Sequence, residues 1–232
     1  MRSWNAAVWL YLDRRILALF ILGFASGLPL LLVYSTLSFW LRQESVSLTE
    51  IGWFSLAGTA YGFKFLWAPL VDHIRIPVLA ARLGQRRSWL LCAQVAVVAT
   101  ILALGATRPG EALTLTAFWA VALAFASATQ DIVVDAFRIE MLDDEEQGSG
   151  AANFVNGYRI GTLAAGAGAL ILADVYGWFW AYAAMAALMV LGMAVTLWLP
   201  EPLRLEGPEP ACEDWRARVQ NAVGEPFREV MT

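Results

Sequence analysis

Long apolar segments occupy most of this sequence, and they restrict the folds that are open to it. A helix needs about 20 consecutive, mainly apolar residues to cross the hydrocarbon core of a bilayer. The apolar runs here are continuous rather than alternating, and an unclosed sheet cannot pair its backbone groups in lipid. The sequence therefore predicts an all-α integral membrane protein, a bundle of six transmembrane helices. The predicted spans are Ile16–Leu41, Glu50–Val71, Ser88–Ala106, Leu113–Ile139, Ala151–Ala173 and Tyr176–Leu199.

The composition argues against several other classes of protein. Of the 232 residues, 59% are hydrophobic and 16% are charged, a balance that is unusual for a soluble domain. The formal charge of -4 is mild and the arginines gather in short loops, so nucleic acid is not an expected partner. Cys92 lies in an apolar segment and Cys212 in a polar tail, which indicates neither a disulfide nor a metal site. No metal or cofactor is expected.

The arginines of the short loops predict the orientation, because cytoplasmic loops carry an excess of positive charge. With the N-terminus inside, Arg42 and Arg108 lie outside and the other loop arginines lie on the cytoplasmic side. Both termini are then cytoplasmic, in an inner (plasma) membrane that the protein crosses several times. We expect a cytoplasmic N-terminal segment (1–15), the transmembrane bundle (16–199) and a cytoplasmic tail or truncated linker (200–232).

Four charged residues lie away from the ends of the predicted spans: Lys64, which is the only lysine, Asp131, Asp135 and Arg159. An ionisable group at the centre of a span costs about 3 kcal/mol on insertion scales, so such groups usually face the bundle interior and mark a functional path. At about 1.5 Å of rise per residue, Lys64, Asp131 and Arg159 fall at one level, about 12 Å from the cytoplasmic surface. We expect Lys64 to pair with Asp131 or Asp135 in a substrate or proton pathway. Structural ion pairs are the alternative, and Arg159 fits either role equally.

Further polar residues lie near these charges along the chain. Gln130 precedes Asp131, and Asn153, Asn156 and Tyr158 lie in the cytoplasmic half of the fifth span. They are candidate contacts for a ligand. Hydrogen bonding between helices is the competing interpretation, since polar side chains often join helices in lipid.

Small residues repeat along two spans. Gly157 and Gly161 begin a stripe at every fourth position of the fifth span, and Gly23 and Gly27 have the same spacing in the first. Such stripes let helix backbones approach closely, either within one chain or in a dimer. Pro29 is expected to kink the first span, because it removes a backbone N–H.

The loop after the second span carries a charge motif. Asp72 is followed by Arg75 and then by Gly84-Gln85-Arg86-Arg87. The arrangement resembles the signature loop of the major facilitator superfamily, G-x-x-x-D-R-x-G-R-R, with a longer spacer. The resemblance implies a cytoplasmic gating loop whose charge contacts break when the helices move. Arg138 is assigned to the same gating group, although its place near a helix end also suits a structural role.

Longer stretches narrow the resemblance. In order they are LGFASGLPLLLVYSTLSFWL, IGWFSLAGTAYGFKFLWAPLVD, RRSWLL, FASATQDIVVDAF and GAANFVNGYRIG. Together they resemble the N-terminal half of AmpG-type muropeptide permeases, which belong to that superfamily. The resemblance implies proton-coupled import of anhydromuropeptides, cell-wall breakdown products, across the inner membrane, with the two carboxylates as candidates for proton coupling. Acetyl-coenzyme A is an alternative substrate, because carriers of it are related.

The superfamily forms its substrate site between two six-helix halves, and this sequence supplies one. The partners that this implies are a small-molecule substrate, protons, the lipid bilayer and a second six-helix half. That half is part of the same gene product, a separate chain or a second copy in a homodimer. A truncated fragment without transport activity, or a regulatory half-transporter, is the alternative.

An enzyme is not expected. Ser26, Ser35 and Ser127 have no histidine within reach on the predicted topology, and no cluster has the spacing of metal ligands.

Overall fold

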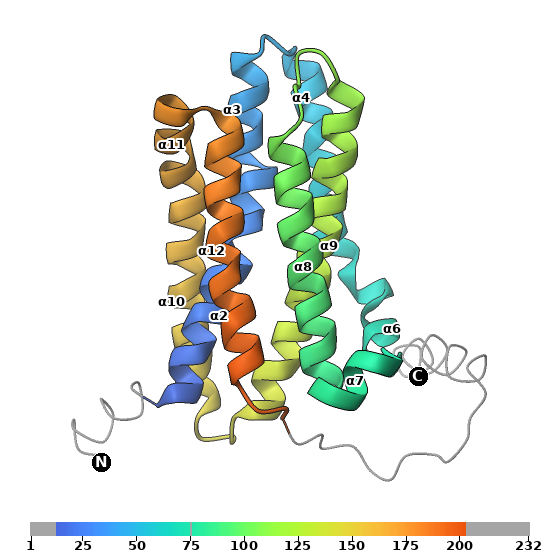
Figure 1. The fold of residues 1–232 in the computed structure, drawn as a ribbon, viewed down its shortest axis with the longest axis vertical. Coiled ribbons are helices and arrows are strands. Elements are labelled where there is room, and N and C mark those ends of the chain that lie inside the picture. The colour runs from blue at the N-terminus through green and yellow to red at the C-terminus, as the bar shows by residue number, and fades with distance from the viewer. Residues whose placement is uncertain (1–12, 75, 203–232) are drawn as a thin grey trace, which may run out of the picture.

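Helices form all the regular structure in the part of the chain that the computed structural model describes, residues 13–74 and 76–202. The long helices run side by side along the longest axis of the molecule, and the short helix α7 lies across one end (Figure 1). We call the end that holds α7 the lower end. The predictions made for residues 1–12, for Arg75 and for residues 203–232 lie outside the described residues. In chain order the elements are α2 (Arg14–Val33), α3 (Ser35–Gln43), α4 (Leu48–Phe54), η1 (Ser55–Gly58), α5 (Thr59–Phe63), η2 (Lys64–Leu66), α6 (Ala68–His73), α7 (Pro77–Leu83), α8 (Gln85–Gly105), α9 (Leu113–Met141), α10 (Gln147–Leu163), the π-helical turn η3 (Ala164–Gly168), α11 (Ala169–Tyr176) and α12 (Trp178–Trp198).

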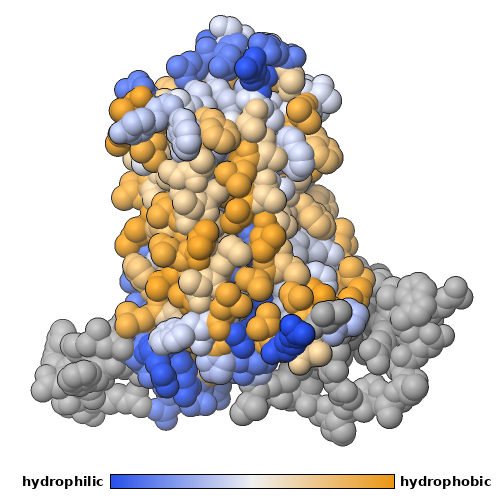
Figure 2. All heavy atoms as spheres, viewed as in Figure 1, coloured by the Kyte–Doolittle hydropathy of each residue, from blue (hydrophilic) through white to orange (hydrophobic). Residues whose placement is uncertain are grey.

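The surface matches a membrane protein. Figure 2 shows apolar side chains around the middle of the bundle and hydrophilic ones at its two ends. Among the described residues, five helical segments are long and apolar enough to cross a membrane. The prediction of an all-α membrane bundle is therefore confirmed. The five segments are Arg14–Gln43, Gln85–Gly105, Leu113–Met141, Gln147–Tyr176 and Trp178–Trp198.

The second predicted span, Glu50–Val71, is helical but is not one continuous helix. It divides into α4, η1, α5, η2 and α6, and this division corrects the sequence-based expectation. The hydroxyls of Ser55 and Thr59 donate to the carbonyls three residues earlier, at 2.6 and 2.7 Å, and compete with regular α-helical bonding. Pro69 has no N–H to donate and its ring crowds the carbonyl of the preceding turn, which accounts for the break before α6.

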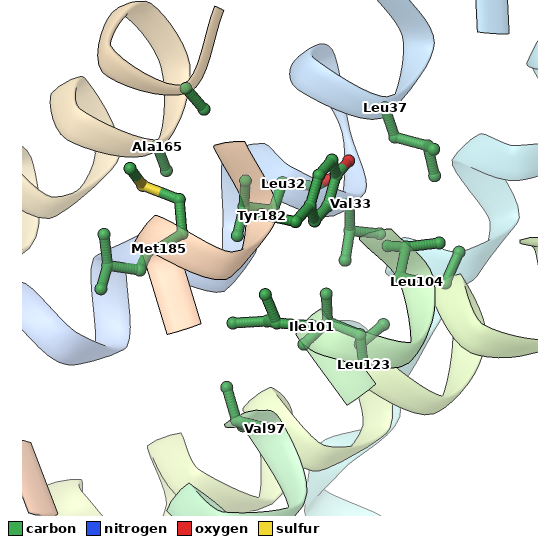
Figure 3. Packing of buried hydrophobic residues seen from close by; sticks show 14 of the residues in the cluster. Leu32, Val33, Leu37, Val97, Ile101, Leu104, Leu123, Ala165, Tyr182 and Met185 are labelled. Atoms are coloured by element: carbon green, nitrogen blue, oxygen red, sulfur yellow. The ribbon is translucent and has the colours of Figure 1, made fainter. Parts of the chain in front are cut away.

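Two other spans are interrupted at the same place in the bundle. The first α-helix runs through Pro29 and ends at Val33, with the break at Tyr34 rather than at the proline. The hydroxyl of Tyr182 donates to the carbonyl of Leu32 at 3.1 Å, next to that break. Opposite it, the hydroxyl of Thr36 donates to the carbonyl of Ala165, inside η3, at 2.8 Å. Figure 3 shows Leu32, Tyr182 and Ala165 in one buried cluster, so side chains of neighbouring helices bond the carbonyls beside both irregularities.

Glycines join α2 to α10. A Cβ atom at Gly157 or Gly161 would collide with the backbone carbonyl of Phe20 or Phe24, and one at Gly23 would collide with that of Phe154. The two helices therefore touch backbone to backbone, as their small-residue stripes predict. This contact lies within one chain, so these glycine faces are not free to form a dimer seam.

Candidate functional site

The Lys64 ammonium group pairs with one of the two predicted carboxylates. Its Nζ atom lies 3.5 Å from Oδ2 of Asp135, and the other oxygen of Asp135 lies 3.8 Å from Nη2 of Arg138. The side chains of Lys64 and Asp135 are 36% and 45% exposed. Lys64 is the first residue of η2, a tight turn between α5 and α6. The irregular second span therefore places the ammonium group of Lys64 beside α9. The pair is open enough for a proton or a ligand to reach it.

Asp131 lies one helical turn before Asp135, in a more enclosed setting. It interacts electrostatically with Lys64 and with Asp135, and its carboxylate is within hydrogen-bonding reach of Ser26 on α2. Ser26 also accepts a hydrogen bond of 3.1 Å from the side-chain amide of Gln130, and both of these residues are buried. The predicted residues Lys64, Gln130, Asp131 and Asp135 therefore lie together, between α2, η2 and α9.

The predicted residues of α10 divide into two groups. Tyr158 is half-buried and lies near enough to Asp131 to interact with it electrostatically. Asn153 is half-buried and donates to the backbone carbonyl of Ser149 at 3.4 Å, a local contact within its own helix. Asn156 and Arg159 are exposed, and Arg159 forms no ion pair within residues 13–74 and 76–202. The structure does not bring Arg159 to the carboxylates of α9.

At the lower end, Arg86 joins three helices. It is buried, pairs with Asp72 at the end of α6, and donates from Nη2 to Glu140 of α9 at 2.6 Å. Its Nε group donates to the two oxygens of Glu140, both at 3.1 Å. The predicted contact between Asp72 and the arginines of the loop is therefore present. The sequence analysis did not identify Glu140 as a second partner of Arg86. Arg138 lies apart from this cluster, beside Asp135 and 5.8 Å from the ring centre of Phe154.

Arg87 and Glu201 cap two helices reciprocally. The Glu201 carboxylate, just beyond α12, accepts from the backbone N–H groups of Arg86 at 2.7 Å and of Arg87 at 3.1 Å. In return, the Arg87 side chain donates to the carbonyls of Thr196 at 2.9 Å and of Leu197 at 2.5 Å. Gly84 makes room for this contact, because its φ of 88° favours glycine and a Cβ there would collide with Glu201. An acidic side chain thus meets the N-terminus of α8 and a basic one the C-terminus of α12.

Two residues beside the carboxylates were missed as site candidates. Tyr61 of α5 lies near Asp131, and Ser127 of α9 lies one turn above it. Ser127 was considered only as a possible nucleophile. Its spacing of four residues from Asp131 was the available signal, because residues at i and i+4 share one face of a helix.

Comparison with known proteins identifies the family of the chain. The family model of the Major Facilitator Superfamily matches residues 14–230. The chain is 49% identical over 185 residues to the anhydromuropeptide permease of Escherichia coli (strain K12), a match that covers 79% of the chain and 37% of the relative. It is 43% identical over 171 residues to putative transporter AmpG 4 of Rickettsia felis, covering 74% and 41%. An uncharacterised protein of Haemophilus influenzae is 38% identical over 193 residues, covering 83% and 44%. The chain spans less than half the length of these relatives.

Proposed function

The chain belongs to the Major Facilitator Superfamily, and from that premise we propose that it is the N-terminal bundle of a muropeptide permease. Its cargo would be anhydromuropeptides or related cell-wall breakdown products. The observation that carries this proposal is the 49% identity to a relative named anhydromuropeptide permease. Both the family and the names of the relatives point to a transporter rather than an enzyme.

Proton coupling forms the second part of the proposal. Lys64 is ion-paired with Asp135 of α9 and interacts electrostatically with Asp131, one turn earlier on the same helix. Protonation of either carboxylate weakens its attraction to Lys64. Because Lys64 and the carboxylates belong to different helical segments, the loss of this attraction would shift the balance between inward-facing and outward-facing states. Arg159 is exposed and forms no ion pair with either carboxylate among the described residues, so the proposal places this step on Lys64.

A second six-helix half would complete the substrate site. Transporters of this kind bind substrate near the midplane, between repeats that rock against each other. The exposed polar side chains of Asn156 and Arg159 on α10 are then available to the cargo or to the second half. We propose that the same gene product, a separate chain or a second copy supplies that half.

The proposed membrane is the inner membrane, with the lower end of the bundle in the cytoplasm. The helix α2 begins and α12 ends at that lower end (Figure 1), where Arg14, Arg15, Arg82, Arg86 and Arg87 also lie. Cytoplasmic flanks of transmembrane helices are enriched in arginine and lysine, which supports this orientation.

Uptake into membrane vesicles tests the proposal. Vesicles from cells that make the natural protein are given a radiolabelled anhydromuropeptide, with or without an imposed pH gradient that is acidic outside. We expect uptake that rises with the gradient and is abolished by a proton ionophore. Acetyl-coenzyme A, offered as a competitor, should leave this uptake unchanged. Uptake that does not change with the pH gradient would contradict proton coupling. Absence of uptake would contradict the choice of anhydromuropeptides as the cargo.

A further inference from the structure

Two hydroxyl groups next to the carboxylates are buried without a hydrogen-bond partner in the described part of the chain. They are Oη of Tyr61 on α5 and Oγ of Ser127 on α9. Ser127 has no exposed surface, and the Tyr61 hydroxyl lies close enough to interact with it. No hydrogen bond of regular geometry joins the two hydroxyls.

Several other hydroxyls in the membrane helices are satisfied by their own helix. Each of four threonines donates to the carbonyl four residues earlier, the usual arrangement of a hydroxyl inside a helix. Ser127 forms no such bond, although the same carbonyl position is available to it. A buried polar group that stays unpaired costs about 1 to 3 kcal/mol. The four threonines are Thr100, Thr116, Thr129 and Thr196.

A third unpaired atom lies on the same side of α9. Gln130 donates from Nε2 to Ser26, but its Oε1 atom is buried and has no partner. Ser127, Gln130 and Asp131 follow the spacing i, i+3, i+4, so all three project towards one face of the helix. The site therefore offers two hydroxyls, each able to donate and accept, and one acceptor. Its natural complement is another O–H group, which also donates and accepts.

We propose that Tyr61 and Ser127 form a binding site for a hydroxyl group beside Asp131. The hydroxyl belongs either to a bound water or to a sugar of the cargo, and the second source rests on the proposed function. Buried waters typically make about three hydrogen bonds to polar groups that are otherwise unsatisfied, and the hydroxyls of Tyr61 and Ser127 are two such groups. Tyr61 and Ser127 are then positioning residues, which hold this O–H group within reach of Asp131.

Three variants of the full natural protein, purified in lipid nanodiscs, test the site. Tyr61→Phe and Ser127→Ala each remove one hydroxyl, and Thr116→Val is the matched control, since it removes a buried hydroxyl of α9 that is bonded to the carbonyl of Ala112, just before that helix. If Ser127→Ala does not fold, Ser127→Cys replaces it with a side chain of similar size. Infrared spectra recorded in ordinary water and in water labelled with oxygen-18 detect bound water by its isotope-shifted O–H band. Calorimetry gives the affinity for an anhydromuropeptide.

A bound water predicts that its band is lost in Tyr61→Phe and Ser127→Ala and kept in Thr116→Val. A cargo hydroxyl predicts instead that both site variants bind the anhydromuropeptide about five- to tenfold more weakly than the control, as expected for one lost hydrogen bond. Site variants that match the control in both measurements would overturn the proposal. If the wild type binds no anhydromuropeptide, the proposed function fails, and the water band alone then decides whether this site exists.

Discussion

The ammonium group of Lys64 lies 3.5 Å from the carboxylate of Asp135, within a bundle whose membrane spans are mainly apolar. More than a third of each side chain is exposed, so the pair contributes little to stability, about 0 to 1 kcal/mol for pairs of this kind. A charge pair that costs free energy on entering a membrane and returns little stability is better explained by function. The first prediction tests that explanation.

Replacing Asp135 by Asn should abolish proton-coupled uptake and leave the protein folded. The substitution keeps the size of the side chain but removes both the charge that attracts Lys64 and the group that takes up the proton. Asp174→Asn, at an exposed position of α11, is the control and should transport normally. The measurement is vesicle uptake at a series of external pH values. Uptake by Asp135→Asn with the pH dependence of the wild type would refute the role of this carboxylate.

Removing the Arg86 side chain should destabilise the lower end strongly. Arg86→Ala leaves the largely buried Glu140 carboxylate without its partner, and unpaired buried charges cost about 3 to 5 kcal/mol. Arg108→Ala is the control, because its pair with Glu111 is exposed and should contribute about 1 kcal/mol or less. Thermal unfolding in detergent micelles compares the two. The idea also predicts that Glu140→Gln restores part of the stability of Arg86→Ala, and equal melting of all variants would disprove it.

Adding a single methyl group at Gly157 should weaken the packing of α2 on α10. The new Cβ atom would collide with the backbone of Phe20, so the two helices must move apart, at a cost of about 1 to 3 kcal/mol. Gly148→Ala is the matched control in the same helix, because a Cβ there meets nothing within 4 Å. Melting temperatures of the two variants give the comparison. If Gly157→Ala is as stable as Gly148→Ala, the backbone contact is looser than described.

The break at Tyr34 should depend on the hydroxyl of Tyr182. Tyr182→Phe removes the donor that bonds the buried carbonyl of Leu32, and an unsatisfied buried group costs about 1 to 3 kcal/mol. Tyr176→Phe, at a position that is 66% exposed, should change the free energy of unfolding little. Chemical unfolding followed by tryptophan fluorescence measures both. A loss of stability in Tyr176→Phe as large as that in Tyr182→Phe would argue against a specific role for this bond.

Much of the architecture could be predicted from the sequence, because continuous apolar runs and glycine spacing are local properties. Lipid requires each spanning backbone to satisfy itself, so those runs had to be helices. The second span shows where such reasoning stops, since Ser55, Thr59 and Pro69 break a helix that hydropathy alone would have kept intact.

The candidate site was predicted less completely, and the reasons are geometric. A pair between Lys64 and either Asp131 or Asp135 could be predicted from depth in the membrane, because rise per residue fixes height, but depth did not decide between the two carboxylates. Depth does not fix direction around a helix axis, so Arg159 was placed with the carboxylates, although it is exposed and forms no ion pair with them among the described residues. Glu140 and Glu201 meet Arg86 across 54 and 115 residues of sequence, and nothing local to either glutamate indicates that contact.

The reciprocal caps between α8 and α12 also bear on the order in which the protein is assembled. Glu201 leaves the ribosome 115 residues after Arg86. The N–H groups in the first turn of α8 therefore lack the Glu201 carboxylate while four more α-helices are synthesised. Until then its N–H groups rely on water at the membrane surface. The contact thus closes only when the last helix of the bundle has been inserted, and its formation distinguishes a finished bundle from every shorter intermediate of synthesis.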